Sequence, residues 1–292
     1  MIRSSSDRLF DGLIIALLLL VAIVMLFPFY YVFVVSFTTP VEYLRKGLVL
    51  FPEQWSLISY RYLLANNVFV KATGVSAFLA TVGTSLSLIV TAAGAYALSR
   101  KRLQGRRVLL ILILMTTLFN PGIIPPYLVV RGMHLINSIW SLIIPVLTSG
   151  WYVILMRGFF ESIPDELEEA AKIDGATDIG TFWRIILPLS LPSLAAFGLF
   201  YAVSYWNTFF SAVLYINKAD LRPLQIVLQM LLIDNSSSAS GEVANSLASD
   251  IRIPTDTLKM AAIIISTVPI LLVYPLLQKH FAKGVMIGSV KG

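Results

Sequence analysis

The sequence predicts an all-α membrane protein with six transmembrane helices in one domain that covers residues 1–292. Hydrophobic residues make up 57% of the chain and charged residues only 13%, whereas soluble domains carry about 25% charged residues. Six stretches without Asp, Glu, Lys or Arg are each at least 19 residues long. That length suits a membrane-crossing helix, which needs roughly 20 apolar residues. The predicted spans are about 13–37, 73–98, 108–130, 138–157, 189–215 and 260–279.

The composition excludes several kinds of protein. Without cysteine, the chain has no disulfide bond, thiol nucleophile or cysteine-ligated metal, and His134 and His280 are too isolated for a metal cluster. The net charge of +6 comes from basic residues at the ends of apolar stretches, so we predict no nucleic-acid partner. A Gly-Lys dipeptide is absent, so the chain lacks the P-loop that binds ATP.

The predicted spans also lack the groups that drive transport or catalysis. The six uncharged stretches behind these spans contain no Asp, Glu, Lys, Arg or His apart from His134, near the end of one stretch, which disfavours a carrier powered by protons or sodium. A membrane transferase would need an acid, a base or a metal near one membrane face. Helix capping explains the one cluster of carboxylates, in residues 161–178, so we predict that the chain is not an enzyme. If the chain transports a solute, the energy must therefore come from outside the spans.

Basic residues set the predicted orientation in the membrane. Arg3 and Arg8 precede the first span, which is too long for a signal peptide and is predicted to be retained. Five Lys and Arg residues lie within residues 100–107. Because cytoplasmic loops are rich in Lys and Arg, we place both termini, the loop 161–188 and the tail 280–292 in the cytoplasm.

Two long segments are then predicted to lie outside. Residues 38–71 contain Trp55 and Tyr60, which are typical of a segment resting at the lipid interface. In the external loop 218–259, the first half is predicted to form a short amphipathic helix at the membrane surface. Two interpretations fit its polar second half: a contact with a protein docked outside, or a linker.

Polar and aromatic residues in two spans indicate a substrate pathway. The prolines at 121, 125 and 126 predict that the third span kinks or ends in its outer half. Aromatic rings and side chains that both donate and accept hydrogen bonds are suited to holding sugars. For the fifth span, the alternative interpretation is an aromatic belt at the membrane interface, with Asn207 hydrogen-bonded to a neighbouring helix. For the third span, it is a proline kink that is satisfied by packing against neighbouring helices. The candidate pathway residues are Asn120, Tyr201, Ser204, Tyr205, Trp206 and Asn207.

Residues 161–188 hold a dense group of charges between apolar stretches and predict a helical hairpin. Ser162 is predicted to cap its first helix in a capping box with Asp165, and Glu168 to pair with Lys172. Gly175 is predicted to end this helix, and a second helix to run from Thr177 or Asp178 to a break near Pro188. Such a hairpin either docks another protein or folds back on its own chain.

The hairpin closely resembles the Glu-Ala-Ala motif of bacterial ABC importer permeases. The match consists of the tripeptide at 169–171, Gly175, Ile185 and the Leu-Pro pair at 187–188, all at the spacing of that motif. The Trp206-Asn207 pair and the glycine-rich tail extend the resemblance over nearly the whole chain. They are similar to maltose-type carbohydrate permeases, especially the subgroup that serves complex oligosaccharides such as alginate and pectin fragments.

The resemblance implies a type I ABC importer permease fold in the cytoplasmic (inner) membrane of a bacterium, with a cytoplasmic coupling helix. It implies three kinds of partner besides the lipid bilayer: a second, homologous permease subunit, two ATPase subunits and an extracytoplasmic sugar-binding protein. ATP and Mg would be held by the ATPase subunits, and this chain would hold no cofactor. The implied coupling residues are Glu168, Glu169, Ala170, Ala171, Asp174, Gly175 and Ala176. The implied ATPase-contacting residues of the tail are Lys283, Gly284 and Gly288.

The predicted cargo is an oligosaccharide, imported by ATP-driven alternating access. An acidic oligosaccharide would favour basic residues in the pathway, and the six uncharged stretches of the spans offer none. The alternative is an ABC permease for an amino acid, phosphate or a metal chelate.

Overall fold

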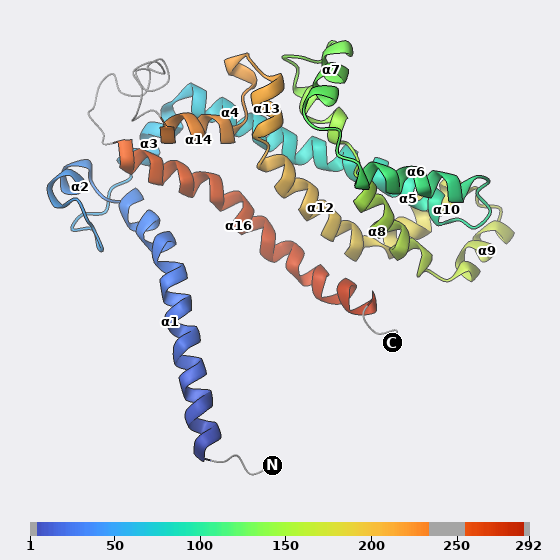
Figure 1. The fold of residues 1–292 in the computed structure, drawn as a ribbon, viewed down its shortest axis with the longest axis horizontal. Coiled ribbons are helices and arrows are strands. Elements are labelled where there is room, and N and C mark those ends of the chain that lie inside the picture. Colours follow the sequence, from blue (N-terminus) through green and yellow to red (C-terminus); the bar gives the residue numbers. More distant parts are fainter. Residues whose placement is uncertain (1–4, 234–254, 289–292) are drawn as a thin grey trace. The chain divides into compact units, whose positions relative to one another are not determined.

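The computed structural model describes residues 5–233 and 255–288, with the side chains of 10–232 and 256–275 (Figure 1). Every regular element in these ranges is a helix, and the one β-bridge joins Thr38 to Trp55. The chain divides into two units. Unit 1 comprises Met1–Val70 and Leu228–Val268, and unit 2 comprises Lys71–Val227 and Pro269–Gly292.

Unit 1 contains a long apolar helix followed by short ones. The complete helices are α1 (Ser5–Ser36), α2 (Pro40–Lys46) and α3 (Ile58–Ala65). The first part of α16 (Thr255–Gly288) also belongs to this unit. Beyond α1, Phe37 packs its ring against Trp55 and Tyr60, and the Tyr60 hydroxyl lies 2.8 Å from Ser36 Oγ. The predicted interfacial segment is therefore a folded structure in which aromatic rings hold the end of α1.

A buried carboxylate fixes the segment after α2. Glu42 is buried, and both its oxygens accept hydrogen bonds from the Glu53 backbone N–H, at 2.9 and 3.1 Å, while Lys46 Nζ lies 3.0 Å away. Burial opposes ionisation of Glu42, but these hydrogen bonds outweigh it and hold the pKa of the carboxyl below its ordinary value. The charged form is therefore the form that stabilises the fold.

We expect the fold of this segment to weaken in acid. Because the folded pKa of Glu42 is depressed, its contribution is complete above the unfolded pKa and disappears as the pH falls through the folded pKa, below about pH 4. At neutral pH, Glu42→Gln should speed exchange of the Glu53 amide hydrogen by about tenfold, the effect of losing one charged hydrogen bond. Hydrogen exchange followed by mass spectrometry checks this. Asp220→Asn, which removes an exposed partner of Lys71, is the control and should leave this amide unchanged.

Unit 2 holds most of the remaining helices. They are α4 (Asn67–Phe78), η1 (Leu79–Gly83), α5 (Thr84–Ser99), α6 (Arg106–Leu118), α7 (Ile124–Gly132), η2 (Ile139–Leu142), η3 (Ile144–Val146), α8 (Gly150–Glu161), α9 (Asp165–Ile173), α10 (Asp178–Thr181), η4 (Phe182–Ile186), α11 (Leu187–Leu189), α12 (Leu191–Trp206), α13 (Phe210–Tyr215), η5 (Ala219–Leu221) and α14 (Leu224–Ile233). The elements η1 and η4 are π-helical turns, and η2, η3 and η5 are 3₁₀ turns. The residues of α4 up to Val70 and those of α14 from Leu228 belong to unit 1, and the last part of α16 completes unit 2.

The core of unit 2 forms where α5 packs against α8 and α12 (Figure 1). Small residues of α5, Ala92 and Ala95, let the larger side chains approach closely. Met156 and Phe160 of α8 and Ile186 of η4 are completely buried there. This core fixes the positions of the helix ends that carry the charged residues.

Several predicted spans are broken in the structure. Within the described residues, three helices are long and apolar enough to cross a membrane, Phe10–Ser36, Asn67–Ser99 and Asp256–Pro275. Two bent pairs raise the number to five: Ile139–Val146 with Gly150–Glu161 at 53°, and Asp178–Leu189 with Leu191–Trp206 at 83°. The six-span count stays a prediction, because α6 alone has only 13 residues.

The break in the predicted third span is confirmed. Helix α6 ends at Leu118, and Gly122 has a φ of +76°, which suits a residue without a Cβ. Asn120 Oδ1 accepts a hydrogen bond of 3.0 Å from the Gly122 N–H, and α7 then begins with Pro125 and Pro126 in its first turn. Proline is tolerated there because the first helical N–H groups need no partner within the helix.

Candidate functional site

The predicted hairpin is present, and Gly175 forms its turn. Helix α9 runs over Asp165–Ile173, and Gly175 has a φ of +80°, in the left-handed region that favours glycine. The Ala176 N–H donates to the Ala171 carbonyl at 2.8 Å and the Gly175 N–H to the Lys172 carbonyl at 3.0 Å. These two bonds make a Schellman motif, which satisfies the last carbonyls of the helix.

The second half of the hairpin also follows the prediction. Thr177 caps α10 by accepting a hydrogen bond of 3.2 Å from the Gly180 N–H. The helix continues through η4 to Leu189 and bends at Ser190, two residues after Pro188. The predicted start and the predicted break are both confirmed.

Two details of the predicted hairpin are wrong. Ser162 does not cap α9: it ends α8, and its hydroxyl donates to the Phe159 carbonyl at 2.7 Å. A serine between two helices can serve either one, and here the free carbonyls of α8 are satisfied. Glu168 forms its ion pair with Arg100 rather than with Lys172.

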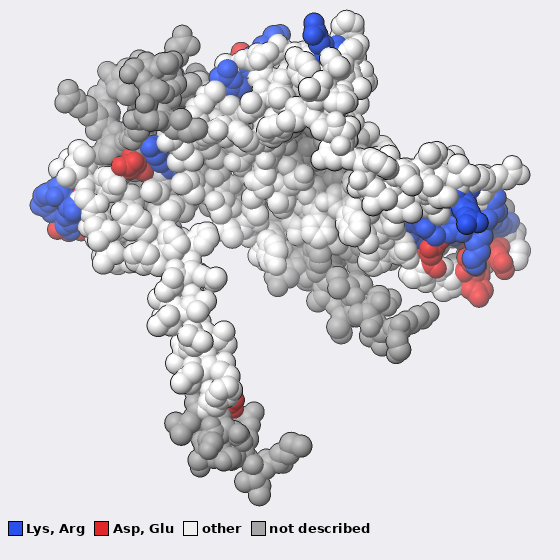
Figure 2. All heavy atoms as spheres, in the orientation of Figure 1, with Lys and Arg blue, Asp and Glu red and all other residues white. Residues whose placement is uncertain are grey.

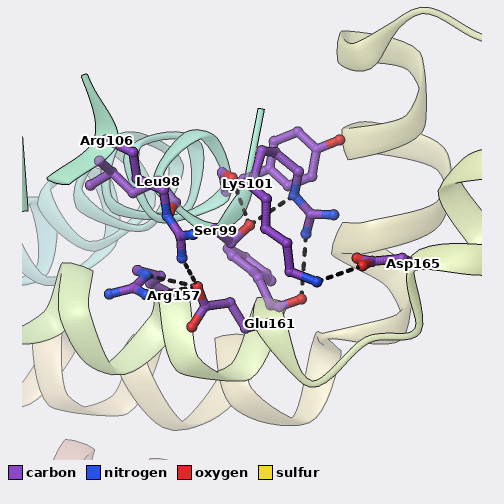
Figure 3. A network of polar contacts seen from close by, with 10 residues as sticks. Leu98, Ser99, Lys101, Arg106, Arg157, Glu161 and Asp165 are labelled. Atoms are coloured by element: carbon purple, nitrogen blue, oxygen red, sulfur yellow. Dashed lines mark hydrogen bonds and ion pairs between the residues drawn. The ribbon is translucent and has the colours of Figure 1, made fainter. Parts of the chain in front are cut away.

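The acidic hairpin (residues 161–188) is bound to the basic loop (residues 100–107) by four ion pairs (Figure 2). Figure 3 shows Lys101 reaching Asp165, at 3.0 Å, and Arg106 and Arg157 converging on Glu161. The four pairs are Arg100–Glu168, Lys101–Asp165, Arg102–Asp178 and Arg106–Glu161. From the sequence alone, we interpret the basic loop only as a sign of orientation. The concentration of basic residues in one segment and of acidic residues in the other is the signal that could have paired them.

These pairs differ in how far they are exposed. Lys101 and Asp165 have 82% and 62% of their side-chain surface exposed, whereas Arg100 and Glu168 have 10% and 8%. Exposed pairs contribute about 0–1 kcal/mol, but removing one partner of a buried pair costs about 3–5 kcal/mol. The hydrogen bond from Lys101 lowers the pKa of Asp165, and the hydrogen bond to Asp178 raises the pKa of Arg102. Both shifts favour the charged forms.

The hairpin leaves an apolar face uncovered. Ile173 is 87% exposed and Ile179 is 73% exposed, on either side of the glycine turn, and Trp183 is also exposed. Among the candidate coupling residues, Glu169, Ala170, Asp174 and Gly175 are exposed and Ala176 is partly exposed. Glu168 and Ala171 are buried and hold α9 against its own chain. The exposed side of the hairpin thus offers apolar and small residues bordered by charge.

A second candidate site is the polar cavity, of about 930 Å³, in unit 2. Four of the six predicted pathway residues line it: Asn120, Tyr201, Ser204 and Tyr205. Thr148, Ser149 and Tyr152 also line it, and none of its lining residues is charged. The cavity therefore offers aromatic rings and uncharged hydrogen-bonding groups.

Helix α5 holds the two tyrosines of the cavity in place. The Tyr201 hydroxyl lies 2.7 Å from Thr91 Oγ1, and the Tyr205 hydroxyl lies 2.8 Å from Ser87 Oγ. The Tyr205 ring also packs closely against Gly83, where an added Cβ would come within 2.8 Å of it. These supporting residues were not among those predicted from the sequence. The helical spacing of the small polar residues 87 and 91 is the one signal in the sequence that could have suggested two of them.

The other two predicted pathway residues lie elsewhere. Trp206 is buried and lines a small apolar pocket with Ala80 and Pro269. Asn207 is exposed and ends α12, and its Oδ1 accepts a hydrogen bond of 3.2 Å from Gln225. Each residue turns the helix by about 100°, so positions 206 and 207 leave the face that carries 201, 204 and 205.

The predictions for the external loop and the tail lie partly outside the described residues. The first half of the external loop forms α14, where Leu224 is buried and its N–H donates to Ser76 Oγ at 2.9 Å. It is therefore packed on α4 at that end. The second half, 234–254, lies outside the described residues. Lys283, Gly284 and Gly288 belong to the last turns of α16, whose side chains lie outside the described residues.

The chain is similar to known proteins over nearly its whole length. Residues 1–287 match the family described as "Binding-protein-dependent transport system inner membrane component". The chain is 44% identical to the polygalacturonan/rhamnogalacturonan transport system permease protein YtcP of Bacillus subtilis (strain 168), over 98% of this chain and 99% of that protein. It is 27% identical to the arabinooligosaccharides transport system permease protein AraQ of Halalkalibacterium halodurans, over 93% of each chain.

A solved structure has a closely similar fold. It is a crystal structure of a bacterial ABC transporter involved in the import of the acidic polysaccharide alginate. The matched chain is 33% identical to this one, with a TM-score of 0.88 and coverage of 96% of this chain and 99% of that chain. The hairpin and the polar cavity described above thus lie in a chain whose fold is that of an ABC importer subunit.

Proposed function

The chain belongs to the family of inner membrane components of binding-protein-dependent transport systems, and from this premise we propose that it is a permease subunit that imports oligosaccharides of acidic polysaccharides. The observation that carries the proposal is the 44% identity, over nearly both full lengths, to a permease of a polygalacturonan/rhamnogalacturonan transport system. The alginate importer, whose subunit shares 33% identity and the fold, points to the same class of cargo.

The chemistry of the polar cavity supports a carbohydrate cargo. Tyr152, Tyr201 and Tyr205 offer ring faces and hydroxyls, and Asn120 and Ser204 offer groups that both donate and accept hydrogen bonds. The lining has no carboxylate that would repel a uronate. It also has no Lys or Arg, so the charge of an acidic sugar would be met by the partner permease or the binding protein.

The acidic hairpin is the proposed receiver of the energy of ATP. An ATPase subunit, which holds ATP and Mg, docks on the exposed face around Ala170, Ile173 and Gly175. The small size of Ala170 and Gly175 permits close approach, and Ile173 and Ile179 supply apolar area to bury. Closure of two ATPase subunits then displaces the hairpins of two homologous permease subunits and reorients the pathway by rigid-body motion.

The proposed function also sets the orientation of the chain in the membrane and its contacts on both sides. Both termini lie in the cytoplasm with the hairpin and the basic loop, and the tail residues Lys283, Gly284 and Gly288 contact the ATPase subunits. An extracytoplasmic sugar-binding protein delivers the cargo from the other side. The chain itself performs no catalysis and binds no cofactor; it provides the passage and the coupling surface.

Loss of uptake tests the cargo. We expect a strain without this gene to lose uptake of labelled oligogalacturonides while uptake of glucose, phosphate and amino acids continues. Plasmid-borne wild-type protein should restore uptake, and the Gly175→Leu variant should not. Unchanged oligogalacturonide uptake together with lost uptake of an amino acid, phosphate or a metal chelate would favour the alternative cargo.

A further inference from the structure

Arg100 makes the most enclosed of the four ion pairs between the acidic hairpin and the basic loop. Arg100 follows α5 directly, and its guanidinium forms an ion pair with Glu168 of α9, both side chains being nearly buried. The guanidinium also lies 4.7 Å from the centre of the Tyr96 ring and donates to the Phe160 carbonyl of α8 at 3.4 Å. Arg100 thus contacts α5, α8 and α9 at once.

The ring under Arg100 extends this contact into the core. Tyr96 packs against Phe182 of η4, with ring centres 5.1 Å apart, and against Phe160 of α8, at 6.3 Å. Glu168 is therefore fixed to a cluster that contains the end of α5, α8 and the second half of the hairpin. A displacement of α9 would therefore act directly on this cluster.

We propose that Arg100 and Glu168 are positioning residues that join α9 to α5, so that both helices move as one body when the hairpin is displaced. This inference rests on the proposed function, because it concerns how the displacement of the hairpin reaches the pathway. Helix α5 carries Ser87 and Thr91, which hold the cavity tyrosines Tyr205 and Tyr201. The Arg100–Glu168 ion pair, called the joint below, thus connects the ATPase-facing side of α9 to the residues that support the cavity.

The other ion pairs of the basic loop are unsuited to this role. Lys101–Asp165 and Arg102–Asp178 are largely exposed, and exposed pairs between long side chains hold their geometry weakly. Arg106 pairs with Glu161, which belongs to α8 and not to α9. Only Arg100 and Glu168, among these four pairs, are both enclosed and connected to α9 and α5.

Transport by variants tests the joint in the complete importer, reconstituted in proteoliposomes with its partner permease, ATPase subunits and binding protein. We expect Glu168→Gln to lower both uptake and the ATP hydrolysis stimulated by loaded binding protein by about tenfold, because a buried arginine loses its partner. The concentration of binding protein that gives half-maximal stimulation should not change. Charge exchange in the double variant Arg100→Glu, Glu168→Arg should recover most of the uptake. Asp165→Asn, which breaks an exposed pair, should stay within about twofold of wild type.

The outcomes separate the joint from the proposed function. Wild-type uptake by assembled Glu168→Gln overturns the joint, and the coupling role of the hairpin still stands if Gly175→Leu is inactive. If uptake is lost in Glu168→Gln and the double variant does not recover it, the joint is also overturned, because the attraction between the two charges would then not be what uptake depends on.

Distances within the native joint provide a second test, which does not depend on a destabilised variant. This chain has no cysteine, so spin labels can be placed at Val90→Cys of α5 and Glu166→Cys of α9 in an otherwise cysteine-free importer. We expect the label-to-label distance to be the same in the nucleotide-free and ATP-bound importer. A distance that changes with ATP would overturn the proposal, because α9 would then move relative to α5.

Discussion

Replacing Gly175 with leucine is expected to abolish ATP-driven uptake while the complex still assembles in the membrane. The backbone of Gly175 is left-handed, which costs a residue with a Cβ about 1–2 kcal/mol. No atom lies within 4 Å of the position that a Cβ would occupy, so the substitution does not disturb the packing of the chain itself. A leucine side chain would instead project from the exposed turn, where the ATPase subunit is proposed to dock. Uptake and substrate-stimulated ATP hydrolysis in proteoliposomes measure the loss.

Gly105→Leu is the matched control for backbone strain. Gly105 also has a positive φ, +75°, and open space around its Cβ position, but it belongs to the basic loop rather than to the hairpin turn. We expect this variant to retain most of the uptake, within about tenfold of wild type, since strain of 1–2 kcal/mol is its only defect. Equal losses in the two variants would show that strain rather than docking disables Gly175→Leu. Normal uptake by Gly175→Leu would remove the turn from the coupling surface.

Replacing Gly83 with alanine is expected to destabilise unit 2 and to impair uptake. The added methyl group would lie 2.8 Å from Cζ and 2.9 Å from Cε1 and Cε2 of Tyr205, closer than packed carbon atoms approach. Tyr205 is buried and its hydroxyl is hydrogen-bonded to Ser87. Its ring can therefore move only by breaking this hydrogen bond and entering the cavity. Overpacking of this kind costs about 1–3 kcal/mol. Thermal unfolding of the purified importer and initial uptake rates measure the two effects.

Gly94→Ala is the control on the same helical segment. Nothing lies within 4 Å of its Cβ position, so alanine should be neutral or stabilise the helix by up to about 1 kcal/mol. A Gly83→Ala importer as stable as Gly94→Ala, with the same uptake, would contradict the close contact between Gly83 and Tyr205.

The turn residues of the hairpin could be predicted because their chemistry is local. Gly175 ends α9 and Thr177 begins α10 for reasons contained in neighbouring backbone atoms. The same holds for the break at Asn120-Pro121. Ser162 was predicted wrongly because it stands between two helix ends, and the sequence alone does not say which end it satisfies.

The contacts that join distant segments could not be predicted in the same way. Glu168 has a lysine at the favourable helical spacing, yet it pairs with Arg100, because α5 and α8 bring the basic loop over α9. The buried ion pair with Arg100 outweighs an exposed pair with Lys172, because an exposed pair within a helix contributes only a few tenths of a kcal/mol. The cavity tyrosines followed from helical spacing, but Gly83, Ser87 and Thr91 became recognisable only when α5 was seen beside α12.

The central claim is that the exposed face of the hairpin is where the ATPase subunit acts. A photo-crosslinking amino acid at Ile173, compared with one at the exposed position Leu109 of α6, tests it directly in intact membranes. The account predicts that Ile173 crosslinks to the ATPase subunit and that Leu109 does not. Crosslinking of Ile173 to the extracytoplasmic binding protein, or to no ATPase at all, would contradict it.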